Sequence, residues 1–153
     1  PEGSAYHFFA NRFDVFAALA EVLSRQFAEA HKKPVPPSRR KTWQQLAGHL
    51  VDVGAGVYAK SPPARQLLIG GKTPPEVKQA ARINDRAVGD AMHGSFSRYF
   101  VIPDSDEMRT AFYYFIAITD LMFTLSIIEP GEITKAMLAV ARRAGVAVLD
   151  TDR

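Results

Sequence analysis

The chain contains no cysteine among its 153 residues. A disulfide framework, a thiolate metal site and a cysteine nucleophile are therefore excluded. The N-terminal segment also lacks a basic region followed by an apolar run and a small-residue cleavage site, so no secretory signal is visible. These absences are compatible with a reducing compartment, and we expect a cytoplasmic protein.

The chain also has little charge of one sign. Its formal net charge is +3, which is too small to indicate nucleic-acid binding without further evidence. A composition of 47% hydrophobic and 23% charged residues is typical of one globular domain with a sizeable core. One soluble domain is therefore the starting expectation.

Motifs of catalysis and cofactor binding are absent or out of context. The stretch GAGVYA at residues 54–59 matches a dinucleotide-binding pattern, but Pro62 and Pro63 interrupt the helix that the pattern requires after its glycines. The stretch IGGKTPP at 69–75 resembles the end of a phosphate-binding loop, yet Gln66 stands where that loop needs glycine. The chain has no G-x-S-x-G elbow and no Glu-x-x-His pair for a di-metal site. We expect no enzymatic activity, no cofactor and no metal.

Hydrophobic periodicity predicts an all-α protein, because no segment shows a convincing alternation typical of strands. Asn11 is expected to cap a first helix that runs to about Ala30, and a proline-rich, basic connector follows from His31 to Lys41. Further helices are expected from Trp43 through Val57, from Ser61 to Gly70, from about 73 to 100, from about 104 to 129, and from about 132 to 149.

The starts of three of these helices carry capping patterns. Thr42 with a glutamine three residues later predicts one N-cap, and Thr73 followed by proline and Glu76 predicts another. Asp104 or Glu107 is expected to cap the fifth helix.

The segment at 110–128 is apolar nearly all the way round, with Asp120 as its one charge. A membrane span is one explanation, but a central aspartate makes it costly, and we expect no membrane association. Burial on two sides explains the segment better, with one face in its own core and the other against a second subunit. The last helix carries a similar apolar stripe, so two helices from each subunit would form a twofold-symmetric four-helix interface. The alternative is a monomer whose other helices enclose this segment.

The stretch GSAYHFFANR, residues 3–12, resembles a pattern of TetR-type transcriptional regulators that covers the recognition helix and the start of the connecting helix. Ser4, Ala10 and Arg12 replace the usual threonine, proline and lysine, and Phe13 stands where an acid is common. The resemblance implies an all-α helical bundle of TetR type that dimerises through its last two helices. It also implies DNA-facing roles for Ser4, Tyr6, His7 and Arg12.

By this resemblance, residues 1–10 would be the remnant of a helix-turn-helix domain and residues 11–153 a ligand-binding and dimerisation domain. Two further helices would have to precede residue 1 for operator binding. We therefore expect the 153 residues to form a homodimer and to bind an effector, but to bind operator DNA only together with those missing helices.

A small hydrophobic or aromatic effector would lie among the second, fourth and fifth helices and would shift the affinity for DNA, most simply in a repressor. The same residues are equally explained as core, and the alternative functions are a dimerisation scaffold without an effector and a hydrophobic-ligand carrier without DNA binding. The candidate contacts are Trp43, Leu50, Tyr58, Val88, Met92, Phe96, Phe112, Phe115 and Thr119, with Asn84, His93 and Asp120 as polar anchors.

Overall fold

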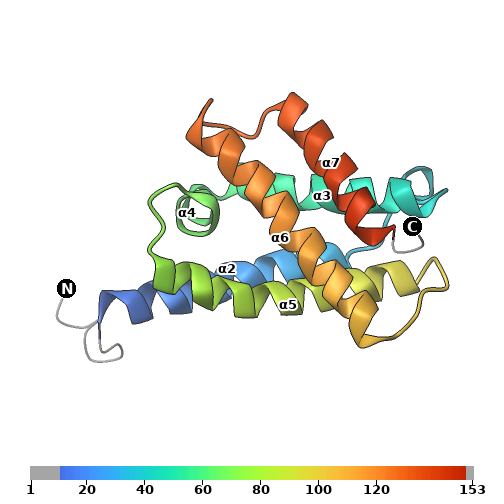
Figure 1. The fold of residues 1–153 in the computed structure, drawn as a ribbon, viewed down its shortest axis with the longest axis horizontal. Helices are drawn as coiled ribbons and strands as arrows, with labels where there is room; N and C mark the ends of the chain where they lie inside the picture. Colours follow the sequence, from blue (N-terminus) through green and yellow to red (C-terminus); the bar gives the residue numbers. More distant parts are fainter. Residues whose placement is uncertain (1–10, 151–153) are drawn as a thin grey trace.

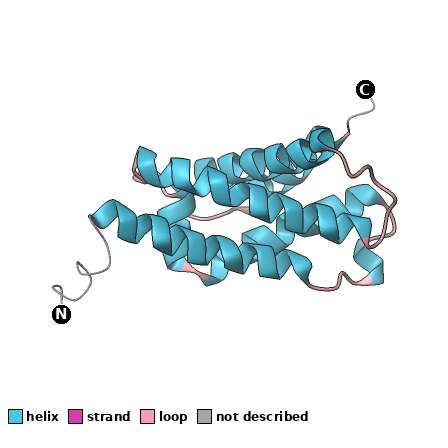
Figure 2. Cartoon of the chain, turned by 90° about the horizontal axis from the view of Figure 1, so that it is seen from below, coloured by secondary structure: helices cyan, strands magenta, loops and turns pink. Residues whose placement is uncertain are grey.

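The computed structural model describes residues 11–150, which are all-α in agreement with the prediction. The helices form a bundle in which α2 and α5 run side by side and α6 crosses them (Figure 1). A second view shows the same layered arrangement of helices joined by short loops (Figure 2). The helices are α2 (Arg12–Lys32), α3 (Trp43–Lys60), α4 (Pro62–Ala64), α5 (Pro75–Ser97), α6 (Asp106–Ile128) and α7 (Lys135–Leu149), with a 3-10 turn at Pro37–Arg39 and a π turn at Arg65–Ile69.

Helix α2 begins where the sequence predicts it. The side chain of Asn11 accepts hydrogen bonds from the backbone amides of Phe13 and Asp14, at 2.9 and 3.1 Å. These bonds satisfy two of the amides that lack partners at a helix start. The helix continues two residues beyond the predicted end because His31, assigned by its sequence to the connector, is buried on the inner face.

Two of the predicted helix caps are wrong. Pro74 occupies the N-cap position of α5, and the hydroxyl of Thr73 instead donates towards backbone carbonyls of the preceding turn, including that of Gly70 at 2.9 Å. Thr73 therefore closes the end of one turn rather than starting the next helix. The cap of α6 is Ser105, whose hydroxyl accepts from the amide of Met108, so neither predicted acid takes this role. The predicted cap of α3, Thr42, is confirmed by its bond from the amide of Gln45 at 3.2 Å.

Helices α5 and α6 approach each other closely at Gly89. A Cβ atom on this residue would lie 3.2 Å from the backbone nitrogen of Tyr113. Helix α7 packs against α6 and α3, and Gly145 has a similar role there, since its Cβ would lie 2.6 Å from the ring of Phe115. Glycine at these two positions brings the three helices near enough to share one core.

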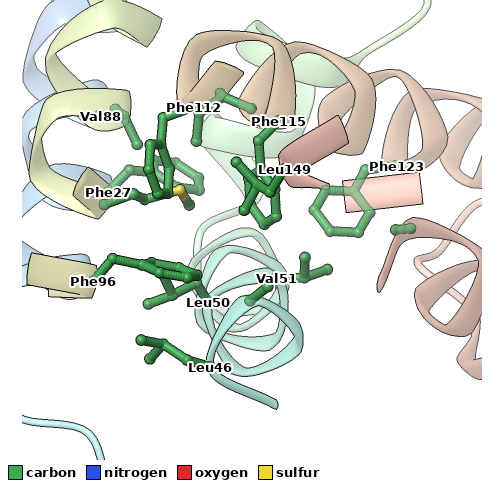
Figure 3. Close-up of a cluster of buried hydrophobic side chains, with 14 of the residues drawn as sticks. Phe27, Leu46, Leu50, Val51, Val88, Phe96, Phe112, Phe115, Phe123 and Leu149 are labelled. Atoms are coloured by element: carbon green, nitrogen blue, oxygen red, sulfur yellow. The ribbon is translucent and has the colours of Figure 1, made fainter. Parts of the chain in front are cut away.

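The core lies between α2, α3, α5, α6 and α7, and apolar side chains from each of them meet in its centre (Figure 3). The ring of Phe112 lies edge-on to that of Phe96, with centroids 5.0 Å apart. This contact between two aromatic rings joins α5 to α6. The labelled core residues are Phe27, Leu46, Leu50, Val51, Val88, Phe96, Phe112, Phe115, Phe123 and Leu149.

Helix α6 has two different apolar faces. The inner face is buried and includes Phe112, Phe115, Thr119 and Phe123. Its outer face carries exposed apolar side chains, among them Tyr114 at 57%, Leu121 at 51% and Leu125 at 39% exposure. The helix is long and apolar enough to cross a membrane, with a mean hydropathy of 1.7, but a core helix of a soluble bundle has the same properties.

Candidate functional site

A cavity of about 130 Å³ lies between α2, α3, α5 and α6. Its walls are mostly apolar, and Phe27, Val88 and Phe123 come from three different helices. The ring of Tyr58 lies between two of these side chains, with centroid distances of 4.5 Å to Phe27 and 5.9 Å to Phe123. Gly54 is also part of the wall, and its Cβ would stand 4.0 Å from the imidazole of His31. The absence of a side chain at this position therefore leaves space inside the cavity.

A hydrogen bond between two helices crosses the polar side of the cavity. The hydroxyl of Tyr58 on α3 donates to Oδ1 of Asp120 on α6, at 3.0 Å. Loss of hydration raises the pKa of the Asp120 carboxyl to about 8, and the negative charge of Asp85 adds to this effect. Burial and the neighbouring Asp120 charge likewise raise the pKa of Tyr58. Near pH 7 the carboxyl group of Asp120 is thus protonated in the folded domain.

A second carboxyl group reaches the cavity from α5. Asp85 is buried and accepts a hydrogen bond at 3.0 Å from Arg82, which is one helical turn earlier and half-exposed. Burial raises the pKa of Asp85 to about 6, whereas the charge of Arg82 and its hydrogen bond act in the opposite direction. This carboxyl therefore has a cationic partner within the protein.

His31 connects α2 to α3 beside the cavity. Its Nδ1 lies 2.7 Å from the carbonyl oxygen of Phe27, and its Nε2 lies 3.1 Å from that of Leu50. A neutral imidazole carries one N–H and can donate to one of these oxygens, whereas an imidazolium can donate to both. Burial lowers the pKa of His31, which favours the neutral form despite these two acceptors.

Comparison with known families adds a second line of evidence. Residues 41–151 match the family model described as the tetracyclin repressor-like C-terminal domain. The chain belongs to this family. No curated protein and no solved structure matches the chain.

Membership in the TetR family confirms the resemblance that residues 3–12 indicate, and it does so from a different part of the chain. TetR-like C-terminal domains belong to ligand-responsive transcription regulators, which in general are not enzymes. The matched residues include the α3, α5 and α6 walls of the cavity, whereas its α2 wall precedes residue 41.

The structure brings half of the predicted effector contacts to the cavity. Trp43, Phe96 and Phe112 instead line a separate hollow of about 270 Å³ near the loop between α5 and α6. Phe115 is fully buried against α7, and the Nε2–H of His93 donates to the carbonyl oxygen of Pro103 at 3.0 Å. Neither these two residues nor Asn84 is part of the cavity wall. Those that are part of it are Leu50, Tyr58, Val88, Met92, Thr119 and Asp120.

The predicted DNA-facing residues lie almost entirely outside the described part of the chain. This applies to Ser4, Tyr6 and His7. Arg12 is described, and it is exposed in the first turn of α2 with its guanidinium 5.1 Å from the ring centroid of Phe13.

Sequence reasoning missed the contribution of α2. Ser24, Phe27 and His31 face the cavity from this helix, at the spacing of three and four residues that puts side chains on one helix face. It also missed Arg82 and Asp85, although an acid and a base three residues apart on a helix are a recognisable pairing signal. The sequence alone does not show that the inner faces of α2 and α5, which are distant along the chain, line the same cavity.

Proposed function

We propose that this domain is the regulatory part of a ligand-responsive transcription repressor and that the α2, α3, α5 and α6 cavity is its effector site. The observation that carries the proposal is the position of α2. This helix lines the cavity near its C-terminal end and leads, at its N-terminal end, to the residues that resemble a recognition helix.

The position of α2 provides a physical route from ligand to DNA. An effector that changes the packing of Phe27 and His31 changes the orientation of α2 relative to α3 and α5. Two recognition helices must stand about 34–36 Å apart to enter successive major grooves. An effector that favours another orientation of α2 would therefore lower the population able to bind DNA, by an amount set by its unequal affinity for the two states.

A cavity-filling substitution tests the effector site. Gly54→Leu places a side chain in the cavity, whereas Gly56→Leu adds the same side chain on the same helix at a position where a Cβ has no neighbour within 4 Å. Thermal unfolding of the chain would be followed with a panel of single-ring aromatic compounds, because binding to the native state raises the melting temperature. We expect compounds that stabilise the parent chain and the Gly56 variant to leave the Gly54 variant unchanged. Equal stabilisation of all three proteins would place binding outside this cavity and refute the proposed site.

We also propose that the protein acts as a homodimer through α6 and α7. The outer face of α6 exposes Tyr114, Leu121, Leu125 and Ile128, and Val140 of α7 is 37% exposed. A row of large apolar side chains on adjacent helices is typical of a subunit interface, and the same face on a second copy would cover it around a twofold axis.

The absence of cysteine permits a direct test of both parts of the proposal. Glu21 is exposed on α2, so Glu21→Cys provides one spin label per subunit without competing thiols. We expect pulsed electron paramagnetic resonance to show one distance between the two spin labels of a dimer. That distance should change when a stabilising compound is added. Absence of an inter-label distance at micromolar concentration would refute the dimer, and a distance unaffected by bound compound would refute the role of α2.

A carrier of hydrophobic ligands without DNA binding is the second candidate, because it too needs the cavity. The same spectroscopic experiment separates the two functions, since a carrier does not require α2 to move in relation to a twin subunit.

A further inference from the structure

The carboxyl group of Asp120 is placed at a cost to folding. Among residues 11–150 no lysine, arginine or histidine forms an ion pair with it, and the hydrogen bond that it accepts comes from the neutral hydroxyl of Tyr58. A buried carboxyl without a counter-cation is less favourable than a well-packed apolar residue in the same place. The side chain thus does not contribute to stability in the way that its apolar neighbours on α6 do.

The other charges around the cavity determine what could approach this carboxyl. Arg82 is already paired with Asp85, and Lys78 is exposed at the edge of the cavity. A ligand anion would therefore meet two carboxyl groups and no unpaired buried cation of the described residues. A ligand cation would meet Asp120 without displacing an existing ion pair. The ionisable groups of the cavity wall are His31, Tyr58, Lys78, Arg82, Asp85 and Asp120.

We propose that the effector is a small organic cation whose protonated amine pairs with Asp120 while its apolar body lies among the aromatic side chains of α2, α3 and α6. This inference rests on the proposed effector site and adds the chemical class of the ligand. The volume of about 130 Å³ sets its size, since an apolar cavity of about 150 Å³ holds benzene. One ring fills such a space, and a short aminoalkyl group on that ring requires side chains of the cavity wall to move apart.

Pairing with an ammonium group requires the ionised form of Asp120. The carboxyl is protonated near pH 7, so an incoming cation replaces a proton, which leaves for the solvent. Proton release makes the affinity depend on pH. Affinity for the cation should rise by nearly tenfold from pH 6 to pH 7 and by about fivefold from pH 7 to pH 8, and affinity for a neutral ligand of the same shape should not.

Three probes of similar shape test the inference on the complete 153-residue chain. Benzylamine is a cation throughout this pH range, benzyl alcohol is neutral, and benzoate is an anion. Isothermal titration at pH 6 and pH 8 would compare the parent chain with Asp120→Asn, which keeps an acceptor for the Tyr58 hydroxyl but cannot ionise. Asp90→Asn is the matched control, because Asp90 is an exposed carboxylate on α5 outside the cavity wall.

We expect benzylamine to bind the parent chain at least tenfold more tightly than benzyl alcohol at pH 8, with a smaller preference at pH 6. Asp120→Asn should lose that preference while still binding benzyl alcohol, which also shows that the variant is folded. Asp90→Asn should behave like the parent. Titration in two buffers of different ionisation enthalpy should count about one proton released per benzylamine at pH 7.

Two outcomes overturn the inference and leave the proposed function intact. One is that benzyl alcohol or benzoate binds as well as benzylamine, and the other is that benzylamine binds the Asp120 and Asp90 variants equally. If none of the three probes binds at millimolar concentration, the inference fails together with the effector site. The pH dependence of the parent chain decides the question even if the Asp120 variant is poorly folded.

Discussion

Replacing Asp120 by asparagine should stabilise the protein at neutral pH and leave it unchanged in acid. In the folded state the pKa of this carboxyl is about 8, against about 3.8 in an unfolded chain. Between these two values the folded protein holds a proton that the unfolded chain has released. The contribution of Asp120 to the free energy of unfolding is therefore complete below pH 4 and is lost as the pH rises towards 8.

The magnitude follows from the width of this pH interval. Each pH unit within it lowers the free energy of unfolding by about 1.4 kcal/mol. At pH 7 the loss amounts to as much as about 4 kcal/mol, which is a large share of the total stability of a small domain. Asparagine has nearly the same shape, can accept the hydrogen bond from Tyr58 and does not titrate. Asp85 interacts with Asp120, so its own titration also differs between the two proteins, and the difference reports the pair of carboxyl groups with Asp120 as the more strongly shifted one.

The measurement is urea unfolding followed by circular dichroism at several pH values from 4 to 8, with protein concentration held fixed because dimerisation would otherwise alter the midpoint. The free-energy difference between Asp120→Asn and the parent should be near zero at pH 4 and should grow steadily to several kcal/mol at pH 7. A difference that is the same at every pH, or that favours the parent at pH 7, would show that the carboxyl is not held in its protonated form.

Three further predictions concern packing and assembly. Gly89→Ala should lower the free energy of unfolding by about 1–3 kcal/mol because the added methyl meets the backbone of α6. Gly94→Ala on the same helix, where a Cβ has no neighbour within 4 Å, should raise it by about 0.5–1 kcal/mol. Urea unfolding measures both changes. His31→Phe should cost about 1–3 kcal/mol because the link from α2 to the backbone of α3 is lost, and hydrogen exchange should become faster at the C-terminal end of α2. Leu125→Glu should shift the protein to a monomer in sedimentation velocity, whereas Ile83→Glu, which replaces an exposed apolar residue on α5, should not; a dimer that survives the first change would refute the proposed interface.

The sequence predicted helix type and order well, because the relevant signals are local. Asn11 precedes a regular apolar period, and Thr42 has a glutamine three residues later, so each cap could be assigned from its neighbours. The cap at Thr73 could not be assigned in this way, since its hydroxyl had two sets of partners within reach along the chain. The hydroxyl donates to the carbonyl oxygens of Gln66 and Leu67 in the π turn before it, and such a turn has no clear sequence signal.

The candidate site was predictable only in part, because it depends on contacts between distant segments. Tyr58 and Asp120 are 62 residues apart, and the sequence indicated each as a site residue without indicating that they are bonded. Phe96 and Phe112 are apolar residues on the core-facing sides of their helices, like the residues of the cavity wall, yet they line a different hollow. Ser24 and Phe27 were missed because α2 reads as an ordinary amphipathic helix, and only the packing against α5 and α3 places its inner face beside the site.

The close backbone contact at Gly89 restricts how the domain can respond to anything that enters it. Two helices that touch through their backbones cannot slide past one another without breaking that contact, but they can tilt about it. The stretch of α5 that carries Arg82 and Asp85 lies on one side of this point, and the stretch that ends at Ser97 lies on the other. An outward displacement at the first end would therefore become an inward displacement at the second, with α5 pivoting as a rigid helix about Gly89.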